Sequence, residues 1–381
     1  MDLQAGDAVA SGATVVAEDP RYLSEQLLTY LGNKRGLLGP IANAIEEVKR
    51  RLGREKLRVW DAFAGSGVVS RFLKAHAERL ISSDLEEYAA VVGRCFLRNQ
   101  STVDMRALGE TVAALNAAVD DSSLSPGFIA ELYSPKDEDR ITAADRVFYT
   151  KENARRLDDY RRRIDGAPLE CRDLLLGPLL SEASIHANTA GVFKGFYKDR
   201  ATKIGRFGGS NGDALLRIRG AIRLAPPRLS RFECDVEVHQ ADANRLANLL
   251  RDLDLAYFDP PYNQHPYGSN YFMLNLLVRY EPPTDFSTVS GIPAGWKRSD
   301  YNRRAKAFQT FLNLAEATDA RFLLISFNDE GFITPEEMQV ALGRLGAIDV
   351  VELPYNAFRG SRNLHGRPLH VVEQLFLVER R

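Results

Sequence analysis

Leu57-Arg58-Val59-Trp60-Asp61-Ala62-Phe63-Ala64-Gly65-Ser66-Gly67 is the stretch that decides the fold. Its apolar beginning predicts a short buried strand that ends at Asp61, and its glycine-rich end predicts a turn into a helix over residues 68–77. A second strand is expected over residues 79–83, and Asp84 follows it at once. Strand, helix and strand in this order, with an acidic residue at the carboxyl end of each strand, are typical of a parallel α/β sheet.

Five more strands are expected farther along the chain, over residues 234–238, 253–258, 321–327, 348–353 and 371–378. The last two are joined by a loop and are expected to pair antiparallel at the sheet edge. Between the second and third strands, residues 100 to 235 are predicted to be mainly helical, because they show no parallel-strand rhythm. Before the first strand, a helix is expected to start near Ser24, to be interrupted near Gly32 and to resume through residues 37–48.

The composition, with 45% hydrophobic and 27% charged residues in 381, is that of an ordinary globular protein. No run of about 18 apolar residues occurs, so a membrane span is not expected. Residues 1–20 contain four acidic residues and no basic one, which predicts a disordered acidic leader rather than a secretory signal. The three cysteines lie far apart, so we expect neither a metal site nor a disulfide framework, and the cytoplasm is the predicted compartment.

Asp259-Pro260-Pro261-Tyr262 is the strongest chemical signal in the chain. It follows the strand over residues 253–258, so it is expected on the same sheet edge as Asp61 and Asp84. Two consecutive prolines donate no backbone hydrogen bonds and hold the segment extended. The segment therefore offers carbonyl and carboxylate acceptors beside an aromatic ring, which suits a planar group that carries an NH2. A simple strand-terminating turn is the alternative interpretation.

The turn from Asp61 to Gly67 also indicates a ligand site. Its glycines allow a ligand to approach the backbone closely, and the N-terminus of the following helix favours polar or anionic groups. Asp84 is placed to bind the vicinal hydroxyls of a ribose. Because Val68-Val69-Ser70 follows the turn, neither the dinucleotide fingerprint nor a P-loop is present. A tight turn without a ligand is the alternative.

Three motifs in this order resemble those of the Dam-like DNA adenine methyltransferases of the α group: Tyr30-Leu31-Gly32-Asn33-Lys34, the turn from Asp61 to Gly67, and Asp259-Pro260-Pro261-Tyr262. In that group a target-recognition region is inserted before the catalytic motif. The resemblance covers residues 22–99 and 236–381. It implies a Rossmann-like S-adenosylmethionine-dependent methyltransferase sheet with an antiparallel edge hairpin and a large, mainly helical insertion. The catalytic domain would comprise residues 21–100 and 236–381, and the inserted DNA-binding region residues 101–235.

The resemblance also implies roles for single residues. The cofactor would be S-adenosylmethionine, bound by Tyr30, Lys34, Asp61, Phe63, Gly65, Gly67, Asp84, Asp242 and Asp259. Tyr30 and Lys34 would contact its methionine end. Asp84 would bind the ribose, and Asp242, which follows another strand, the adenine. The catalytic residues would be those that form the pocket of the target base: Asp259, Pro260, Pro261 and Tyr262.

The expected mechanism begins with extrusion of the target adenine from double-stranded DNA, because N6 of a stacked base cannot reach an enclosed cofactor. Tyr262 would stack on the flipped base, a contact worth roughly 1–3 kcal/mol. Asp259 and the carbonyl of Pro260 would accept the two N6 hydrogens and aim the nitrogen lone pair at the sulfonium methyl. No cysteine follows a proline, so the covalent route of cytosine-C5 enzymes lacks its nucleophile.

Three basic segments are predicted to bind DNA phosphates, although the net charge of the chain is −1. The first alternates with aromatic residues and contains Lys194, Lys198, Arg200, Lys203 and Arg206. The second contains Lys297, Arg298, Arg303, Arg304 and Lys306. The third is the loop over residues 354–372, with Arg359 and Arg362. A solvated basic face is the alternative for each segment.

The leading hypothesis is a site-specific DNA methyltransferase that acts on N6 of adenine. An RNA adenine-N6 methyltransferase shares the chemistry, but the long insertion and the motif before the cofactor turn argue against it. In a cytosine-N4 DNA methyltransferase serine more often replaces Asp259, and in a protein-glutamine methyltransferase asparagine usually does. A catalytically inactive binding module is disfavoured by the intact motif. A cognate restriction enzyme is a candidate partner, and no membrane partner is expected.

Overall fold

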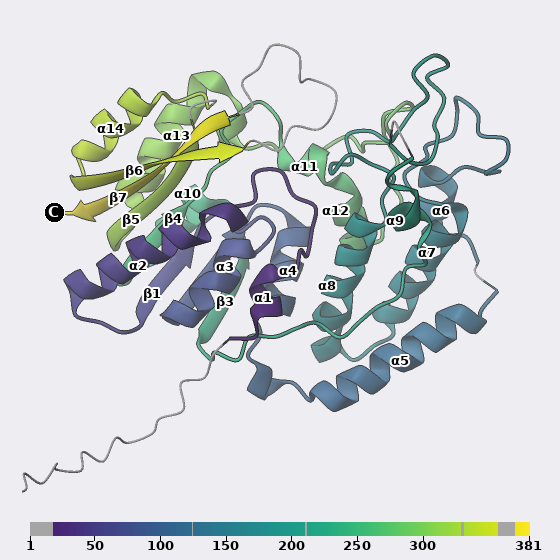
Figure 1. Cartoon of the computed structure of the whole chain (residues 1–381), viewed down its shortest axis with the longest axis horizontal. Coiled ribbons are helices and arrows are strands. Elements are labelled where there is room, and N and C mark those ends of the chain that lie inside the picture. The colour runs from purple at the N-terminus through teal and green to yellow at the C-terminus, as the bar shows by residue number, and fades with distance from the viewer. Residues whose placement is uncertain (1–17, 124, 210–211, 329–330, 357–369) are drawn as a thin grey trace, which may run out of the picture.

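The computed structural model describes residues 18–123, 125–209, 212–328, 331–356 and 370–381, and a seven-stranded sheet lies at the centre of this part (Figure 1). The strands are β1 (Leu57–Asp61), β2 (Ala77–Asp84), β3 (Asp235–Gln240), β4 (Leu253–Phe258), β5 (Ala320–Asn328), β6 (Gly346–Asn356) and β7 (His370–Arg380). Their order is β3-β2-β1-β4-β5-β7-β6. The first five are parallel, and β7 is antiparallel to both of its neighbours.

The strand order reverses between β1 and β4, because the chain continues from β1 to β2 on one side and returns with β4 on the other. In open α/β sheets, ligands bind outside the carboxyl ends of the strands at such a point. Every residue of β4 is buried, as expected for a central parallel strand that is covered on both faces. The register pairs Asp61 with Tyr257 and so brings the ends of β1 and β4 side by side.

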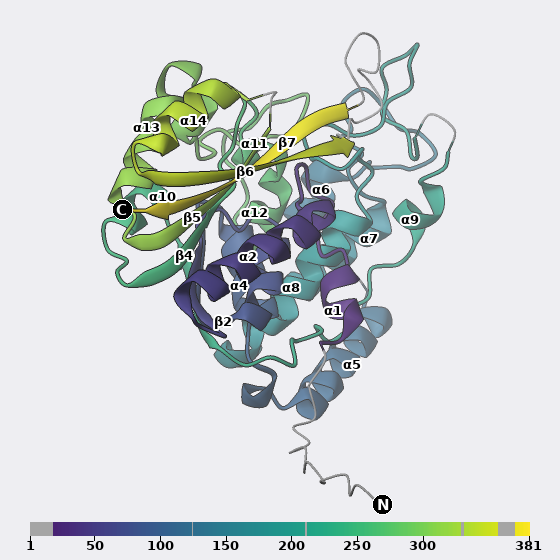
Figure 2. The same cartoon turned by 60° about the vertical axis from the view of Figure 1, so that its left-hand side comes forward.

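Helices cover both faces of the sheet (Figures 1 and 2). One face packs against α2 (Leu38–Leu52) and α3 (Val68–Leu73). The other packs against α10 (Ala243–Ala247), α13 (Arg304–Ala317) and α14 (Pro335–Gly343). The helix α2 forms because its apolar residues recur at helical spacing and are buried on one side, while its last turn is basic, which suits the negative end of the helix dipole.

The chain between β2 and β3 forms the predicted helical insertion, with α5 (Met105–Asp121), α6 (Phe128–Tyr133), α7 (Lys151–Asp165), α8 (Leu169–Ile185) and α9 (Leu215–Arg219). Buried side chains of α5 to α8 belong to the same cluster as those of α4 (Glu87–Phe96) and α12 (Phe272–Arg279). The helix α4 precedes the insertion in sequence and α12 follows β4, and both pack beside it (Figure 1). The insertion therefore shares its hydrophobic core with α4, which packs on β2 and β3, and with α12.

The structure confirms the seven predicted strands, the antiparallel edge pair and the position of the insertion. The helix after the glycine turn is shorter than predicted, since α3 ends at Leu73 and a 3-10 turn follows over Lys74–His76. The helix predicted from Ser24 is wrong, because α1 (Pro20–Ser24) ends there and residues 25–34 are not helical. Long-range packing overrides local periodicity in this segment, which buries Leu27 and Leu28 in the core shared with the insertion.

Part of the predicted leader, residues 1–17, lies outside the described residues. Disorder was expected up to residue 20, and residues 18–20 correct that boundary. The side chain of Asp19 caps α1 by accepting from the backbone N–H of Arg21, and Glu18 accepts from the Ser230 hydroxyl. Among the described helices, none is long and apolar enough to cross a membrane.

Close packing of α8 on α4 gives a stability prediction. A Cβ added to Gly177 would lie 2.6 Å from Sγ of Cys95, whereas one added to Gly109, inside α5, would meet no atom within 4 Å. We expect Gly177→Ala to lower the free energy of unfolding by about 1–3 kcal/mol through overpacking. Gly109→Ala, the matched control, should leave it unchanged or raise it by up to about 1 kcal/mol. Urea unfolding measures both, and equal effects would contradict the packing argument.

Candidate active site

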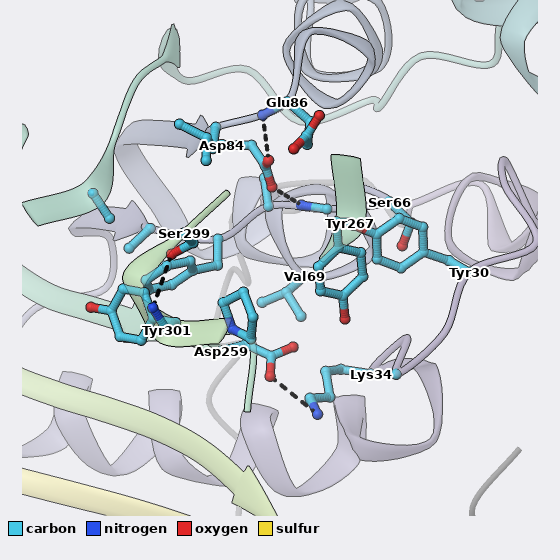
Figure 3. Close-up of a pocket in the computed structure, with 18 of the residues that line it drawn as sticks. Tyr30, Lys34, Ser66, Val69, Asp84, Glu86, Asp259, Tyr267, Ser299 and Tyr301 are labelled. Carbon is cyan, nitrogen blue, oxygen red and sulfur yellow. Dashed lines mark hydrogen bonds and ion pairs between the residues drawn. The ribbon is translucent and has the colours of Figure 1, made fainter. Parts of the chain in front are cut away.

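A cleft opens at the carboxyl edge of the sheet, where β1 and β4 end (Figure 3). It is lined by the loop before α2, the turn after β1, the segments that follow β2, β3 and β4, and part of residues 297–302. Seven of the nine residues predicted to bind the cofactor line it: Tyr30, Lys34, Phe63, Gly65, Asp84, Asp242 and Asp259. Asp61 and Gly67 belong to the same turn but are not among the described lining residues.

The turn after β1 needs glycine at two positions. Gly65 and Gly67 have φ angles of 52° and 75°, a left-handed conformation that other residues rarely adopt. A Cβ on Gly65 would also lie 2.9 Å from the ring of Tyr30. Gly67 is the N-cap of α3, so the turn ends where the backbone N–H groups of that helix are free to bind a ligand.

Asp84 anchors the turn to the end of β2 (Figure 3). Its two carboxylate oxygens accept from the backbone N–H groups of Gly65 and Glu86, each at 2.8 Å. Burial raises the pKa of Asp84 and outweighs these hydrogen bonds. Burial likewise raises the pKa of Glu86 to about 7, although Asn275 donates to its carboxylate at 2.6 Å. Two carboxyl groups therefore border this end of the cleft, and only Asp84 was predicted from the sequence.

Asp61 is fully buried at the end of β1. Its Oδ2 accepts from the Ser70 hydroxyl at 2.5 Å, while its Oδ1 is buried and has no hydrogen-bond partner among the described residues. Burial, with smaller contributions from the nearby Asp259 and Asp84 carboxylates, raises the pKa of Asp61 to about 7, although hydrogen bonds from Ser70 and the backbone of Phe63 lower it. A buried acceptor without a partner is costly, which favours a cationic or hydrogen-donating ligand here.

Asp259 is part of a buried ion cluster with Lys34 and Glu373. Nζ of Lys34 lies 3.2 Å from Oδ1 of Asp259 and 2.6 Å from Oε1 of Glu373 (Figure 3 shows the first contact). Burial raises the pKa of Asp259 to about 6, Lys34 opposes that rise and Glu373 adds to it. Burial alone would lower the pKa of Lys34, but the two carboxylates together raise it above its ordinary value. The cluster therefore holds an ammonium between two carboxylates.

Tyr262 stands beside this cluster. Its hydroxyl accepts from Nζ of Lys34 and donates to Oδ1 of Asp259 at 3.0 Å. Its ring meets the edge of Phe327 with a centroid distance of 5.3 Å. Pro261 lines the cleft, whereas Pro260 and Tyr262 are not among its described lining residues. The motif thus presents one carboxylate and one proline ring to the cleft, and the ring of Tyr262 lies beside them.

Aromatic rings form two further walls. Tyr30 stacks on Tyr267 and Tyr271 with centroid distances of 5.2 and 4.6 Å. At the opposite end, Phe63 meets Tyr301 edge to face at 5.4 Å. Asp242 lines the same end, where its side chain caps α10 by accepting from the backbone of Arg245.

Sequence reasoning missed several functional candidates in these walls. Lys297, Ser299, Tyr301 and Asn302 line the cleft, although the basic character of residues 297–306 had suggested only a DNA-binding segment. Tyr267 and Tyr271 lie shortly after the Asp259 motif, and an aromatic repeat there was an available signal. Glu373 gave no signal, because a single glutamate in an apolar strand has no local pattern.

Apart from Lys297, the residues of the predicted DNA-binding segments are not among the described lining residues of the cleft. Lys194 contacts Nδ1 of His265 at 3.1 Å, Lys198 lies over the Phe196 ring, and Arg206 donates to the carbonyl of Gly209. Arg200 and Lys203 lie in the loop between the bridged residues Lys198 and Gly205. Arg303 pairs with Asp300, and Arg304 lies over the ring of Phe332. Arg359 and Arg362 fall outside the described residues, so their role stays a prediction.

Comparison with known proteins agrees with this geometry. The model of the D12 class N6 adenine-specific DNA methyltransferase family matches residues 30–338. The chain is 26% identical over 367 residues to the Type II methyltransferase M.NlaIII of Neisseria lactamica, covering 92% of this chain and 100% of that protein. It is 28% identical over 353 residues to the Type II methyltransferase M.CviAII of Paramecium bursaria Chlorella virus 1, covering 92% and 97%. The family match runs through residues 101–235, for which the sequence motifs had found no counterpart.

The ion cluster predicts a pH-dependent loss of stability. Lys34→Met would leave the carboxylates of Asp259 and Glu373 buried without a cation, so we expect the free energy of unfolding to fall by about 3–5 kcal/mol near pH 8. The loss should shrink as the pH falls, because without Lys34 the pKa of Asp259 in the folded protein rises further and protonation removes the unpaired charge.

The control for this prediction is Lys306→Met, since Lys306 pairs with Asp300 at the exposed surface and such a pair contributes about 1 kcal/mol or less. Chemical denaturation across the pH range checks both variants. A loss for Lys34→Met that does not depend on pH would contradict the electrostatic explanation.

Proposed function

Because the chain belongs to the D12 class N6 adenine-specific DNA methyltransferase family, we propose that the cleft at the carboxyl edge is its active site, with S-adenosylmethionine along the Asp61–Gly67 turn and the target adenine at Asp259. The observation that supports this most is that Asp84 and Asp259 line one cleft from the ends of separate strands, with the buried Asp61 close to both of them. Residues 101–235 are then the target-recognition region, and residues 21–100 and 236–381 the catalytic domain.

The residues of the cleft fit S-adenosylmethionine. The unpartnered Oδ1 of Asp61 suits the ammonium of the methionine end, and Tyr30 closes that end of the cleft. Asp84 lies at the end of β2 and binds the turn after β1, which is where an acidic residue meets the ribose in folds of this kind. Phe63 and Tyr301 offer apolar walls for an adenine ring, with Asp242 as an acceptor beside them.

Lys34 takes a different role from the one that the motif implied. The Lys34 ammonium donates hydrogen bonds to Glu373 and Tyr262 and forms an ion pair with Asp259 at 3.2 Å. These three partners surround the ammonium, so Lys34 is turned toward the catalytic motif rather than toward the methionine end. We assign it instead to orienting Asp259.

The base pocket follows from the same contacts. Oδ1 of Asp259 is bound by Lys34 and Tyr262, whereas Oδ2 has no hydrogen-bond partner among the described residues. Oδ2 is thus the acceptor for one N6 hydrogen, and the carbonyl of Pro260 is the acceptor for the other. The adenine reaches this position only when it is flipped out of the duplex, where the ring of Tyr262 stacks on it.

Positioning supplies most of the rate in this arrangement. S-adenosylmethionine supplies a methyl group that its positive sulfur has already activated. The protein has to fix N6 in line with that methyl and to stabilise the positive charge that N6 acquires. Asp259 does both, because its carboxylate accepts from N6 before transfer and faces the charged nitrogen afterwards. It does not need to be a strong base, since the proton leaves after transfer.

Duplex DNA is proposed to contact the basic residues of the insertion and of the segment before α13. Lys194, Lys198, Arg200, Lys203 and Arg206 share one stretch of the insertion. Lys194 contacts His265, which lies six residues after Asp259, and this contact joins the basic stretch to the catalytic segment. Arg303 and Arg304 lie at the start of α13. The relatives named Type II methyltransferases support a restriction–modification setting, in which a cognate restriction enzyme acts on the same site.

Substitution of Asp259 tests the catalytic assignment. Asp259→Ala should retain affinity for S-adenosylhomocysteine within a few fold and lower methyl transfer to DNA by about 10²-fold to 10³-fold or more, because the N6 acceptor is lost. Asp349→Ala, a surface aspartate paired with Arg51, is the control and should keep normal activity. Transfer of a radiolabelled methyl group measures both. Activity near that of the unmodified enzyme in Asp259→Ala would refute the assignment.

The pH dependence of cofactor affinity tests the role of Asp61. Because the pKa of Asp61 is about 7, its carboxyl becomes protonated as the pH falls through neutrality and no longer attracts an ammonium. Calorimetric titration with S-adenosylhomocysteine should therefore show affinity that decreases from pH 8 to pH 6. Asp61→Asn should bind more weakly and lose this dependence. Glu86→Gln is the control, because the pKa of Glu86 is also about 7, and it should keep the dependence.

Loss of the pH dependence in Glu86→Gln, with its persistence in Asp61→Asn, would transfer the proposed ammonium contact from Asp61 to Glu86. That result would leave the catalytic assignment of Asp259 untouched.

A further inference from the structure

Glu373 is the unexplained member of the buried cluster around Asp259. It lies on β7, is 2% exposed, and binds Nζ of Lys34 at 2.6 Å. The Ser326 hydroxyl of β5 donates to the same carboxylate oxygen at 2.8 Å. Lys34 itself is 4% exposed. A glutamate is almost never buried to this degree unless other groups satisfy it, and here a lysine and a serine do so.

Charge balance shows what this glutamate adds. Asp259 and Lys34 alone would form a neutral buried pair, in which the ammonium cancels the charge that the carboxylate offers to N6. With Glu373 the cluster has two carboxylates and one ammonium, so its net charge is −1 when all three are ionised. The ammonium is also closer to Glu373, at 2.6 Å, than to Asp259, at 3.2 Å. Glu373 thus competes for the positive charge and leaves Asp259 with its negative charge only partly cancelled.

The geometry of the cluster adds a second effect. Lys34 comes from a non-helical loop, and its long side chain would have many conformations without a fixed partner. Glu373, itself held by Ser326 across two hydrogen-bonded strands, fixes the position of the ammonium. The fixed ammonium then holds Oδ1 of Asp259, and this fixes the orientation of the carboxylate and the direction in which Oδ2 points.

We propose that Glu373 is a positioning residue for methyl transfer, which acts through Lys34 to aim Oδ2 of Asp259 at N6 and gives the base pocket the negative charge that stabilises the positive charge developing on that nitrogen. The proposal rests on the proposed role of Asp259. Glu373 does not itself touch the adenine or the cofactor.

The charged and titratable groups that face Asp259 from the surrounding elements are known from the structure. They include Lys34, Asp61, Tyr257, Tyr262, Tyr267 and Glu373. Burial raises the pKa of Asp259, and the charge of Glu373 raises it further. Removal of that charge therefore lowers the pKa of Asp259, so its carboxylate persists to lower pH. A substitution that loosened the fold without changing the charge of Glu373 would leave this contribution to the pKa of Asp259 in place.

Glu373→Gln tests the proposal, because it removes the charge and keeps the shape and the acceptor oxygen. We expect kcat to fall about tenfold or more, with the KM for DNA and the Kd for S-adenosylhomocysteine within about twofold, since only the aim and charge of Asp259 change. The acid limb of the kcat/KM profile, expected near pH 6 in the unmodified enzyme, should move to lower pH. Glu379→Gln, on the same strand but paired with Arg51 near the surface, should leave kcat and the profile unchanged.

A second variant keeps the test decisive if Glu373→Gln does not fold. Ser326→Ala leaves all three charges in place and removes the hydroxyl that holds Glu373, so kcat should fall by about threefold without a change in the acid limb. Normal kcat in Glu373→Gln, or a lower kcat with an unmoved acid limb, would overturn the proposal. The activity of Asp259→Ala separates the catalytic role of Asp259 from the positioning role of Glu373. If Asp259→Ala is inactive while Glu373→Gln is normal, the positioning role fails and the assignment of Asp259 stands.

Discussion

A single buried ammonium joins the parts of the chain that have to meet for the proposed active site to form. Nζ of Lys34 belongs to the loop before α2, Asp259 follows β4 at the centre of the sheet, and Glu373 lies on β7 near its edge. Each of these charges would be costly to bury alone, so their mutual contacts add to the packing of Tyr30 that fixes the loop to the sheet. That loop also contains Tyr30, whose ring closes one end of the cleft and excludes a side chain at Gly65. The wall of the cleft that this loop forms is therefore tied to the ammonium.

The antiparallel course of β7 has a chemical consequence. In a parallel sheet only the carboxyl ends of the strands reach the edge where ligands bind. Because β7 runs in the opposite direction, its beginning lies at that edge, and its register sets Glu373 opposite Asn328 at the end of β5. A parallel strand in this place would present its last residues instead. The antiparallel edge pair thus adds the Glu373 carboxylate to a site whose other carboxylates come from the ends of parallel strands.

Sequence patterns were sufficient for the sheet and for one side of the site. Strand periodicity and the positions of Asp61, Asp84 and Asp259 at strand ends are local features, and a parallel fold brings such ends together whatever the rest of the chain does. The family match then favours adenine-N6 in DNA over the RNA and cytosine-N4 alternatives. Glu373 escaped prediction because it meets Lys34 across 339 positions of sequence and no local pattern marks such a pair. The segment 25–34 was misjudged for the same reason, since its conformation follows from distant partners of Tyr30 and Leu28.

The shared hydrophobic core fixes the position of the insertion relative to the cleft. The helix α4 begins at Glu87, directly after two residues that line the cleft, and packs against α8 of the insertion so closely that Gly177 has no room for a side chain. On the other side, the contact between Lys194 and His265 joins the basic stretch of the insertion to the segment that follows Asp259. A domain attached by flexible linkers would hold DNA without fixing where the flipped base arrives. If the insertion binds the duplex as proposed, its packing on α4 and α12 would hold the DNA in one frame with the proposed base pocket, which is what alignment of N6 with the methyl group requires.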